Sequence, residues 1–261
     1  MKLLTNKTLK TFSILFLCLL FIETIFRLGS NYPIFDFAMI RIIIGFIIVS
    51  SLLSVLFSFF NDIVRNICMF IVIIFASVYA IVQAGFNTYL GTYMSFSTAS
   101  QAGAIGDFVG EFIGSIKIQY WLILIPLIVF IVLFILFEKK INIYESNLEI
   151  NYIDKIKGKK KKEEEQEKRL KLKKKKLLIN RLVFMGVFVI SCILYYLSLI
   201  VPFMQNDLQM VDNLTLYKNP SMPNIAISQF GVEGFCYLDV KALIFPYDET
   251  SSSYSSEEKK V

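Results

Sequence analysis

Long apolar runs separated by short polar segments dominate the sequence. Each run approaches or exceeds the roughly 20 residues that an α-helix needs to cross a hydrocarbon core. They cover residues 11–26, 37–60, 63–85, 120–137 and 182–203. The pattern therefore predicts an all-α, polytopic membrane protein with five transmembrane helices. Pro126 lies inside the fourth run and predicts a kink or a broken turn there.

A lysine-rich block at residues 155–176 connects the fourth and fifth runs. Basic loops beside membrane spans stay in the cytoplasm, where the anionic inner leaflet attracts them. Residues 138–181 are therefore expected to form a charged cytoplasmic loop, either as a solvated helix or as a partly disordered linker. Alternation then places the amino end inside, and residues 29–36, 87–119 and 204–261 outside. We expect a multi-pass protein of the cell membrane with an extracytoplasmic carboxyl tail.

Composition agrees with this class of protein. Hydrophobic residues make up 56% of the chain and charged residues 18%, whereas soluble domains carry about 25% charged residues. The net charge of +6 comes mostly from the lysine-rich block, which has no interleaved aromatic residues. We therefore expect anionic phospholipids as its partner and no nucleic acid. The chain has no histidine and its four cysteines show no CxxC spacing, so no disulfide framework, metal site or cofactor is expected in it.

The end of the first apolar run carries charge. No small-residue cleavage site follows this run, which favours a signal anchor retained as the first span over a cleaved signal peptide. Glu23 and Arg27 lie one helical turn apart on one face, and Arg41 lies at a similar depth in the second span. Unpaired charges are costly in a bilayer, so we expect Glu23 to pair with an arginine or the arginines to snorkel towards headgroups. The alternative is an outer-leaflet pocket for an anionic headgroup.

The connector at residues 87–119 contains a predicted interfacial helix. Its apolar positions recur at helical spacing: Ile105, Phe108, Val109, Phe112, Ile113 and Ile116. Glycines recur every fourth residue beside them, where another helix could approach closely: Gly106, Gly110 and Gly114. Asp107 and Glu111 lie next to this ridge, either as the solvated face of an amphipathic helix or as cation ligands, although two ligands do not complete a metal site.

The tail at residues 204–261 is the longest segment without a membrane span. Residues 219–223 form a turn-rich break, and the aromatics and glycines of residues 229–239 predict packing on the membrane surface. Residues 251–258 are linker-like. A tail of this length and composition is not expected to fold as an independent domain, so we interpret it as a juxtamembrane segment followed by a linker.

Three short stretches carry a resemblance to a known family. Residues 23–27 read Glu-Thr-Ile-Phe-Arg, residues 93–96 read Tyr-Met-Ser-Phe, and residues 229–231 read Gln-Phe-Gly, followed by aromatics up to Tyr237 and by Asp239. Together with the five predicted spans, this layout resembles the membrane domain of the lipoteichoic acid synthase family of Gram-positive bacteria. Those proteins are polyglycerol phosphate transferases with a large extracellular, sulfatase-like catalytic domain.

The resemblance implies a function for the membrane part alone. The family's catalytic domain uses a threonine nucleophile and a divalent metal, usually manganese, held by acidic and histidine ligands. This sequence has no histidine and reaches Val261 in a serine-rich segment before any such domain, so no catalytic residue is assigned in it. We therefore expect a membrane-anchoring domain that is inactive alone and whose partner is a separate or fused extracellular catalytic domain.

Two functions follow from these expectations. A synthase-like anchoring domain would orient a phosphatidylglycerol-type donor, with Arg27, Arg41 and Lys117 contacting phosphate and Tyr93 and Trp121 at headgroup depth. The alternative is a component of a small-solute transporter or a membrane assembly scaffold. Transporters favour inverted repeats, whereas five spans do not divide into equal halves.

Overall fold

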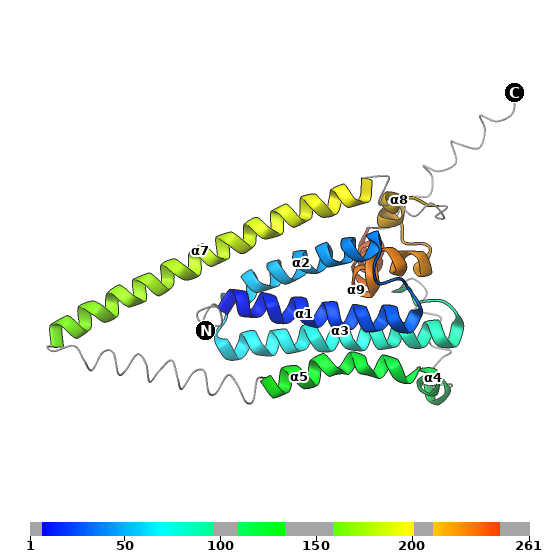
Figure 1. Cartoon of the computed structure of the whole chain (residues 1–261), viewed down its shortest axis with the longest axis horizontal. Helices are drawn as coiled ribbons and strands as arrows, with labels where there is room; N and C mark the ends of the chain where they lie inside the picture. The colour runs from blue at the N-terminus through cyan, green and yellow to red at the C-terminus, as the bar shows by residue number, and fades with distance from the viewer. Residues whose placement is uncertain (1–6, 97–108, 134–158, 201–210, 246–261) are drawn as a thin grey trace, which may run out of the picture.

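The computed structural model of the chain describes residues 7–96, 109–133, 159–200 and 211–245, and all regular elements in these ranges are helices. Four of the helices are long and apolar enough to cross a membrane (Figure 1). They are α1 (Lys7–Ser30), α2 (Phe37–Phe57), α3 (Asp62–Leu90) and the part of α7 (Lys159–Ile200) that begins at Leu170. The all-helical class expected from the sequence is thus confirmed, and four of the five expected spans correspond to helices that are long and apolar enough to cross a membrane.

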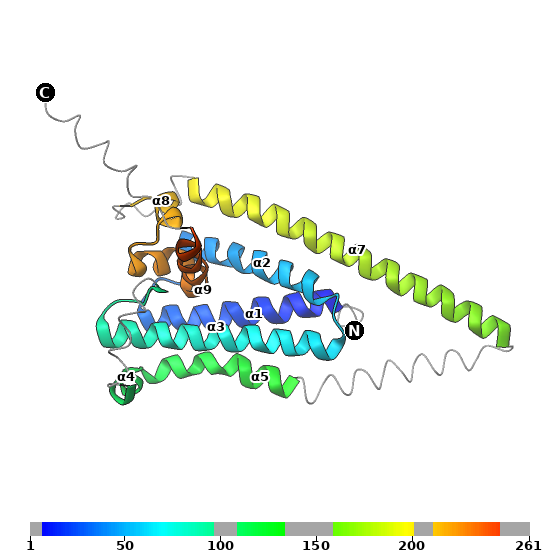
Figure 2. The same cartoon turned by 180° about the vertical axis from the view of Figure 1, so that it is seen from behind.

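The spans form a flat row of neighbours. Helix α2 lies between α1 and α7, and α3 packs on the other side of α1, as both ribbon views show (Figures 1 and 2). Apolar side chains form two buried clusters along this row. The larger is centred on residues such as Ile22, Phe26 and Phe46, and the smaller on Leu15 and Ile73.

The predicted fourth span is a short, broken helix in the part of the chain that the structure describes. It begins as a 3-10 helix, η2 (Ile118–Leu124), and continues as α5 (Ile125–Leu133). Pro126 is the second residue of α5, where its missing N–H breaks no helical hydrogen bond, so the expected irregularity falls at the junction. The remainder of this predicted span, residues 134–137, lies outside the described residues, and a full fifth crossing is not established.

One end of the bundle is tied by cations from three segments. Lys7 and Arg65 both contact Asp62, at 2.7 and 2.6 Å. Arg181 of α7 donates to the hydroxyl and the carbonyl oxygen of Ser58 at 2.8 and 2.7 Å. Its guanidinium also lies 3.9 Å from the centre of the Phe59 ring. We call this the lysine end, because the basic part of α7 projects beyond it.

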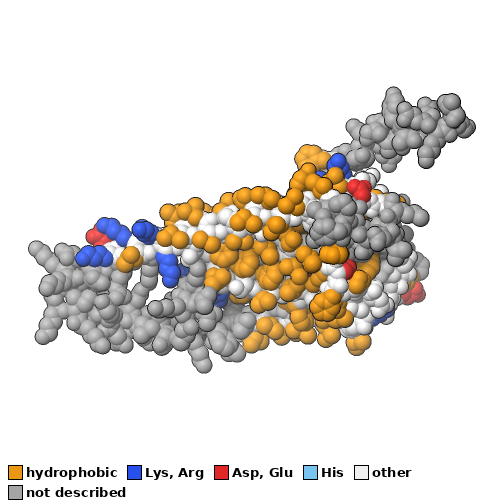
Figure 3. All heavy atoms as spheres, turned by 45° about the horizontal axis from the view of Figure 1, so that its top comes forward, with side chains coloured by type: hydrophobic (Ala, Val, Ile, Leu, Met, Phe, Trp, Pro, Cys, Tyr) orange, Lys and Arg blue, Asp and Glu red, His pale blue; other side chains and the backbone are white. Residues whose placement is uncertain are grey.

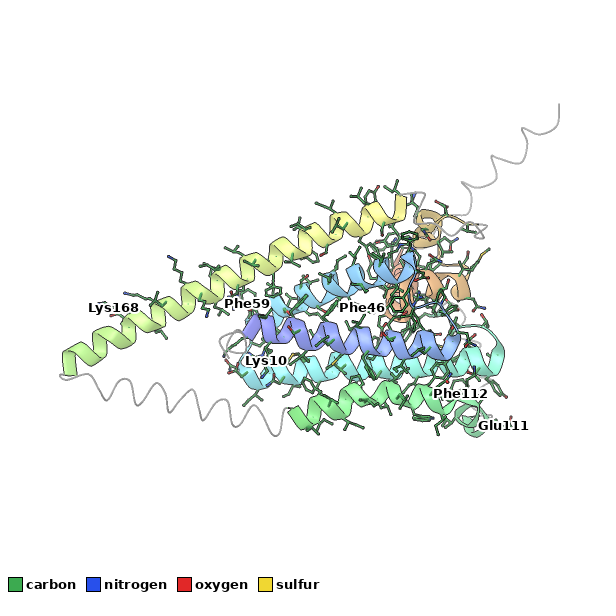
Figure 4. The ribbon with its side chains drawn as sticks, in the orientation of Figure 1. Lys10, Phe46, Phe59, Glu111, Phe112 and Lys168 are labelled. Carbon is green, nitrogen blue, oxygen red and sulfur yellow. The ribbon has the colours of Figure 1, made fainter. Side chains whose placement is uncertain are left out.

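Helix α7 is longer than any membrane requires. Its 42 residues span about 63 Å at the rise of an α-helix. The segment from Lys159 to Arg181, expected as a solvated helix or a linker, continues the apolar span as one helix. Figure 4 shows Lys168 on the projecting part. Figure 3 shows lysine and arginine side chains gathered at this end, while apolar side chains cover the side of the bundle. Residues 138–158 lie outside the described residues.

The described part of the carboxyl tail packs against the opposite end of the spans. Helices α8 (Asn213–Lys218) and α9 (Pro223–Ile244) pack there, and α9 contacts α1, α2 and α3. Phe230 and Phe235 are buried in the larger apolar cluster. Of the aromatics in residues 229–239, only Tyr237 is exposed, and the others are buried against the span ends. We call this the α9 end.

The described part of the predicted interfacial helix is α4 (Val109–Ser115). Phe112 packs against Gly85 and Phe86 of α3, so this apolar face covers the end of a span. No described atom lies within 4 Å of a Cβ built at Gly110 or Gly114. Among the described residues, no helix therefore approaches these two glycines closely.

Candidate functional site

A break in helix α9 creates the polar centre of the α9 end. Gly231 has φ 77° and ψ 170°, a conformation that essentially only glycine adopts, and it divides α9 into two half-helices. The last carbonyls of the first half and the first N–H groups of the second half then lack partners within the helix. In an apolar surrounding such groups must be satisfied by other side chains. Three charged side chains of the spans supply those partners.

Glu23 binds the start of the second half-helix. Its Oε2 accepts a hydrogen bond from the Val232 N–H at 3.0 Å, and its Oε1 accepts from Arg27 Nε at 3.1 Å. The carboxylate therefore meets the positive end of a helix dipole. The side chain is fully buried. A Cβ at Gly231 would lie 2.9 Å from Glu23 Oε2, so glycine leaves room for the carboxylate against the α9 backbone.

Arg27 binds the end of the first half-helix and the turn after α1. It donates to the carbonyl oxygen of Ser228 at 2.5 Å and to that of Pro33. It also lies 3.5 Å from the carboxylate of Asp36, which caps α2 by accepting from the Met39 N–H. The cation thus joins α1, the start of α2 and α9 in one buried contact.

Arg41 of α2 binds the same half-helix. Its guanidinium donates to the Gln229 carbonyl at 3.4 Å, to Gln229 Oε1 at 3.1 Å and to the Ser198 carbonyl at 3.2 Å. It also lies 5.6 Å from the centre of the Phe230 ring. Two cations at the carbonyl end and one carboxylate at the N–H end match the partial charges of the broken helix.

The segment that follows α3 is held along the length of α9. At one end, Asn224 Oδ1 accepts from the Tyr93 N–H at 3.2 Å. At the other, the carboxylate of Asp239 accepts from Ser95 Oγ at 2.6 Å and from the Phe96 N–H at 2.5 Å. These contacts pair α9 with a segment distant in sequence.

A tyrosine contact joins this segment to α1. The hydroxyl of Tyr93 donates to Ser30 Oγ at 3.2 Å, and Ser30 Oγ also lies 3.1 Å from the hydroxyl of Tyr120. The ring of Tyr120 lies against Gly29, which has no side chain to obstruct it. Burial raises the pKa of Tyr93, so its hydroxyl stays protonated and can donate.

Glu233 is a second carboxyl group beside Glu23. Both of its carboxylate oxygens are inaccessible to water and have no hydrogen-bond donor among the described residues. Burial, and then the neighbouring Glu23 carboxylate, hold the pKa of Glu233 well above its usual range. Burial also raises the pKa of the Cys236 thiol, one turn further along, to about 11.

The residues expected to contact a lipid headgroup divide into two groups. Arg27, Arg41 and Tyr93 are buried and bonded to other parts of the chain, so their polar groups face protein in this structure. Lys117 and Trp121 are exposed at the α9 end, Trp121 by 44%. Glu23 and Arg27 form the ion pair expected from their spacing.

No cation site is formed among the described residues of the predicted interfacial helix. Gly106 and Asp107 lie outside the described residues. Glu111 is exposed, accepts from the Tyr89 hydroxyl at 3.4 Å and lies at the tip of the molecule in Figure 4. Among the described residues no group of three metal-ligating side chains comes together.

Five residues of the site were missed by sequence reasoning. The contacts of Asn224, Gln229, Gly231 and Glu233 with the rest of the site were not predicted, nor was the contact of Asp239 with Ser95. A signal was present, because buried charges in spans require partners and the polar residues of the tail are available for them. The described site contains charges and backbone groups that fix one helix in place.

No family model, curated protein or solved structure matches the chain.

Proposed function

We propose that this chain is the membrane-anchoring domain of a lipoteichoic acid synthase-like glycerol phosphate transferase. The observation that carries the proposal is the meeting of the three stretches on which the resemblance rests. Glu23 and Arg27 of the first stretch contact Val232 and Ser228, which flank the Gln-Phe-Gly stretch. Ser95 of the Tyr-Met-Ser-Phe stretch contacts Asp239. The three stretches thus meet around α9 in the folded chain.

The role of such a domain is to hold the chain that follows α9 against the membrane. Helix α9 is fixed at its start, at its break and near its end by the contacts described above. A rigid attachment limits the positions that a catalytic domain after α9 can reach, which raises the effective concentration of a lipid-borne donor. Lys117 and Trp121, exposed at the same end, are the proposed headgroup contacts.

The transporter alternative has less support. Transport sites gather polar residues near the bilayer midplane. The buried charged residues of the described spans instead lie near helix ends. Three of them, Glu23, Arg27 and Arg41, are bonded to a helix that packs on those ends. This distribution favours anchoring over a substrate path.

A chimaera tests the proposal. Residues 1–246 of this chain would replace the membrane domain of a working lipoteichoic acid synthase, in cells depleted of their own enzyme. The control is the same catalytic domain behind one unrelated transmembrane helix. We expect the chimaera to restore polymer synthesis well above the control, and Arg27→Leu in the chimaera to reduce it while the protein stays in the membrane.

One result would contradict the proposed anchoring function. The chimaera would be present in the membrane and would cleave a soluble phosphoglycerol donor normally. It would nevertheless make no more polymer than the single-helix control. That outcome would reject a synthase-type anchoring role for this chain.

A further inference from the structure

We propose that Glu23 and Glu233 form a proton-binding site, and that the proton they share holds the second half of α9 against the spans. Glu23 Oε2 lies 3.0 Å from the nitrogen of Val232, the residue directly before Glu233, and both carboxylate oxygens of Glu233 are buried beside it. Two ionised carboxylates are both acceptors and repel each other. A hydrogen bond between them exists only when one of them carries a proton.

The hydrogen bonds and the burial around the two carboxyl groups favour one proton on this pair. Glu23 already accepts from Arg27 and from the Val232 N–H, so its charge is compensated. Glu233 has no hydrogen-bond donor among the described residues, and its carboxylate oxygens are inaccessible to water. A second negative charge in this position would be buried without a partner, which is costly. Protonation of Glu233 removes the charge and supplies the donor that the Glu23 carboxylate can accept.

Each element packed against α9 contributes other titratable groups. Helix α1 contributes Arg27 besides Glu23, and Arg41 of α2 binds the first half of α9. From α3, Tyr79 lies near Cys236 and Asp239 of α9 itself. Helix α8 contributes Tyr217 and Lys218, which lie close to Lys241 two turns beyond Glu233. Helix α7 contributes Tyr195, which lies near Tyr237 of α9. The arginines are bound at the first half-helix, so the contact at the start of the second depends on the glutamate pair.

The pH dependence has a defined sign. Docking raises the pKa of Glu233 above its ordinary value of 4.5, so the docked state holds a proton that the undocked state releases. Docking is therefore complete at acidic pH and weakens as pH rises from the ordinary carboxyl range towards the raised pKa. Over that window, the ratio of undocked to docked α9 increases up to about tenfold per pH unit.

Distance measurements test this directly. Nitroxide labels would be attached to the exposed positions Leu28 and Tyr237, as Leu28→Cys and Tyr237→Cys, in full-length protein in lipid nanodiscs with the native cysteines replaced by alanine. Pulsed electron resonance would be recorded from pH 5 to pH 9. We expect one short distance at pH 5 and a growing fraction of longer distances as pH rises.

Substitutions separate the proposal from general pH effects. Glu233→Gln mimics the protonated residue, so it should keep the short distance at every pH. Glu111→Gln is the matched control at an exposed glutamate and should retain the pH dependence of the parent. The proposal is overturned if the parent shows no pH dependence, if Glu233→Gln responds to pH as the parent does, or if Glu233→Gln is undocked throughout.

Discussion

Ser95 and Asp239 lie 144 positions apart in the chain, yet the Ser95 hydroxyl donates to the Asp239 carboxylate at 2.6 Å. The carboxylate also accepts from the Phe96 N–H, and both side chains are buried. This contact joins the segment after the third span to the last helix. Loss of this contact would therefore indicate that α9 is no longer docked against the spans.

Replacing Asp239 with alanine should destabilise the protein by about 1.5–3 kcal/mol, because a charged acceptor is removed from two buried donors. Ser95→Ala should cost less, since the Phe96 N–H keeps its partner. The double variant should cost less than the sum of the two single changes. Denaturant titration in detergent micelles measures all three. Strict additivity would show that the two side chains do not interact in the folded protein.

Arg27→Leu should be among the most damaging changes, at about 3–5 kcal/mol, because it leaves the Glu23 carboxylate buried beside an uncharged residue. Adding Glu23→Gln in the same chain should recover part of the loss. Lys7→Ala is the control, since it removes an exposed ion pair with Asp62 and should cost under about 1 kcal/mol. Thermal unfolding followed by circular dichroism measures each variant. Equal losses for Arg27→Leu and Lys7→Ala would contradict the buried role of Arg27.

Gly231→Ala should destabilise the docked α9 by more than about 1 kcal/mol, since alanine is strained at φ 77° and its Cβ would meet the Glu23 carboxylate. Gly110→Ala is the matched control. It lies in α4 with open space around it and should be neutral or stabilising by up to about 1 kcal/mol. Proteolysis of α9 under native conditions reports the difference. A Gly231→Ala protein as resistant as the parent would show that this backbone conformation is dispensable.

Some features of this fold could be predicted from the sequence because they depend on neighbouring residues. The spans follow from local apolar runs, and the Glu23–Arg27 pair follows from a spacing of one helical turn. Both depend on residues close in the chain. Their recognition therefore required no knowledge of the fold.

The docking of α9 depends on distant residues and on one backbone angle. Arg41 and its acceptor Gln229 are 188 positions apart, and nothing local to either residue indicates the other. The positive φ of Gly231 could not be predicted from the sequence either, because a glycine in an apolar helix often serves close packing alone. The lipid contact expected of Arg27 and Arg41 rested on depth alone, which does not distinguish a headgroup from a broken helix as the partner.

The Cys236 thiol should react slowly with alkylating reagents. It is buried, and its pKa of about 11 lies above the ordinary value of 9.0, so at pH 8 the reactive thiolate is about 100-fold rarer than for a free cysteine. The rate should be measured with Cys18, Cys68 and Cys192 replaced by alanine. Asp239→Ala, which loosens α9, should accelerate it. A rate equal to that of a free thiol would show that α9 is not docked.

Labelling from each side of the membrane tests the predicted orientation. Phe245 is exposed at the α9 end, and Phe60 is exposed at the lysine end. In protein without native cysteines, Phe245→Cys should react with an impermeant maleimide in intact cells, and Phe60→Cys only after permeabilisation. The physical reason is the lysine-rich part of α7, which is expected to resist translocation and to keep its end in the cytoplasm. Reversed labelling would contradict the assigned orientation while leaving the fold intact. Labelling of both positions from one side would contradict the arrangement of the two ends across a membrane.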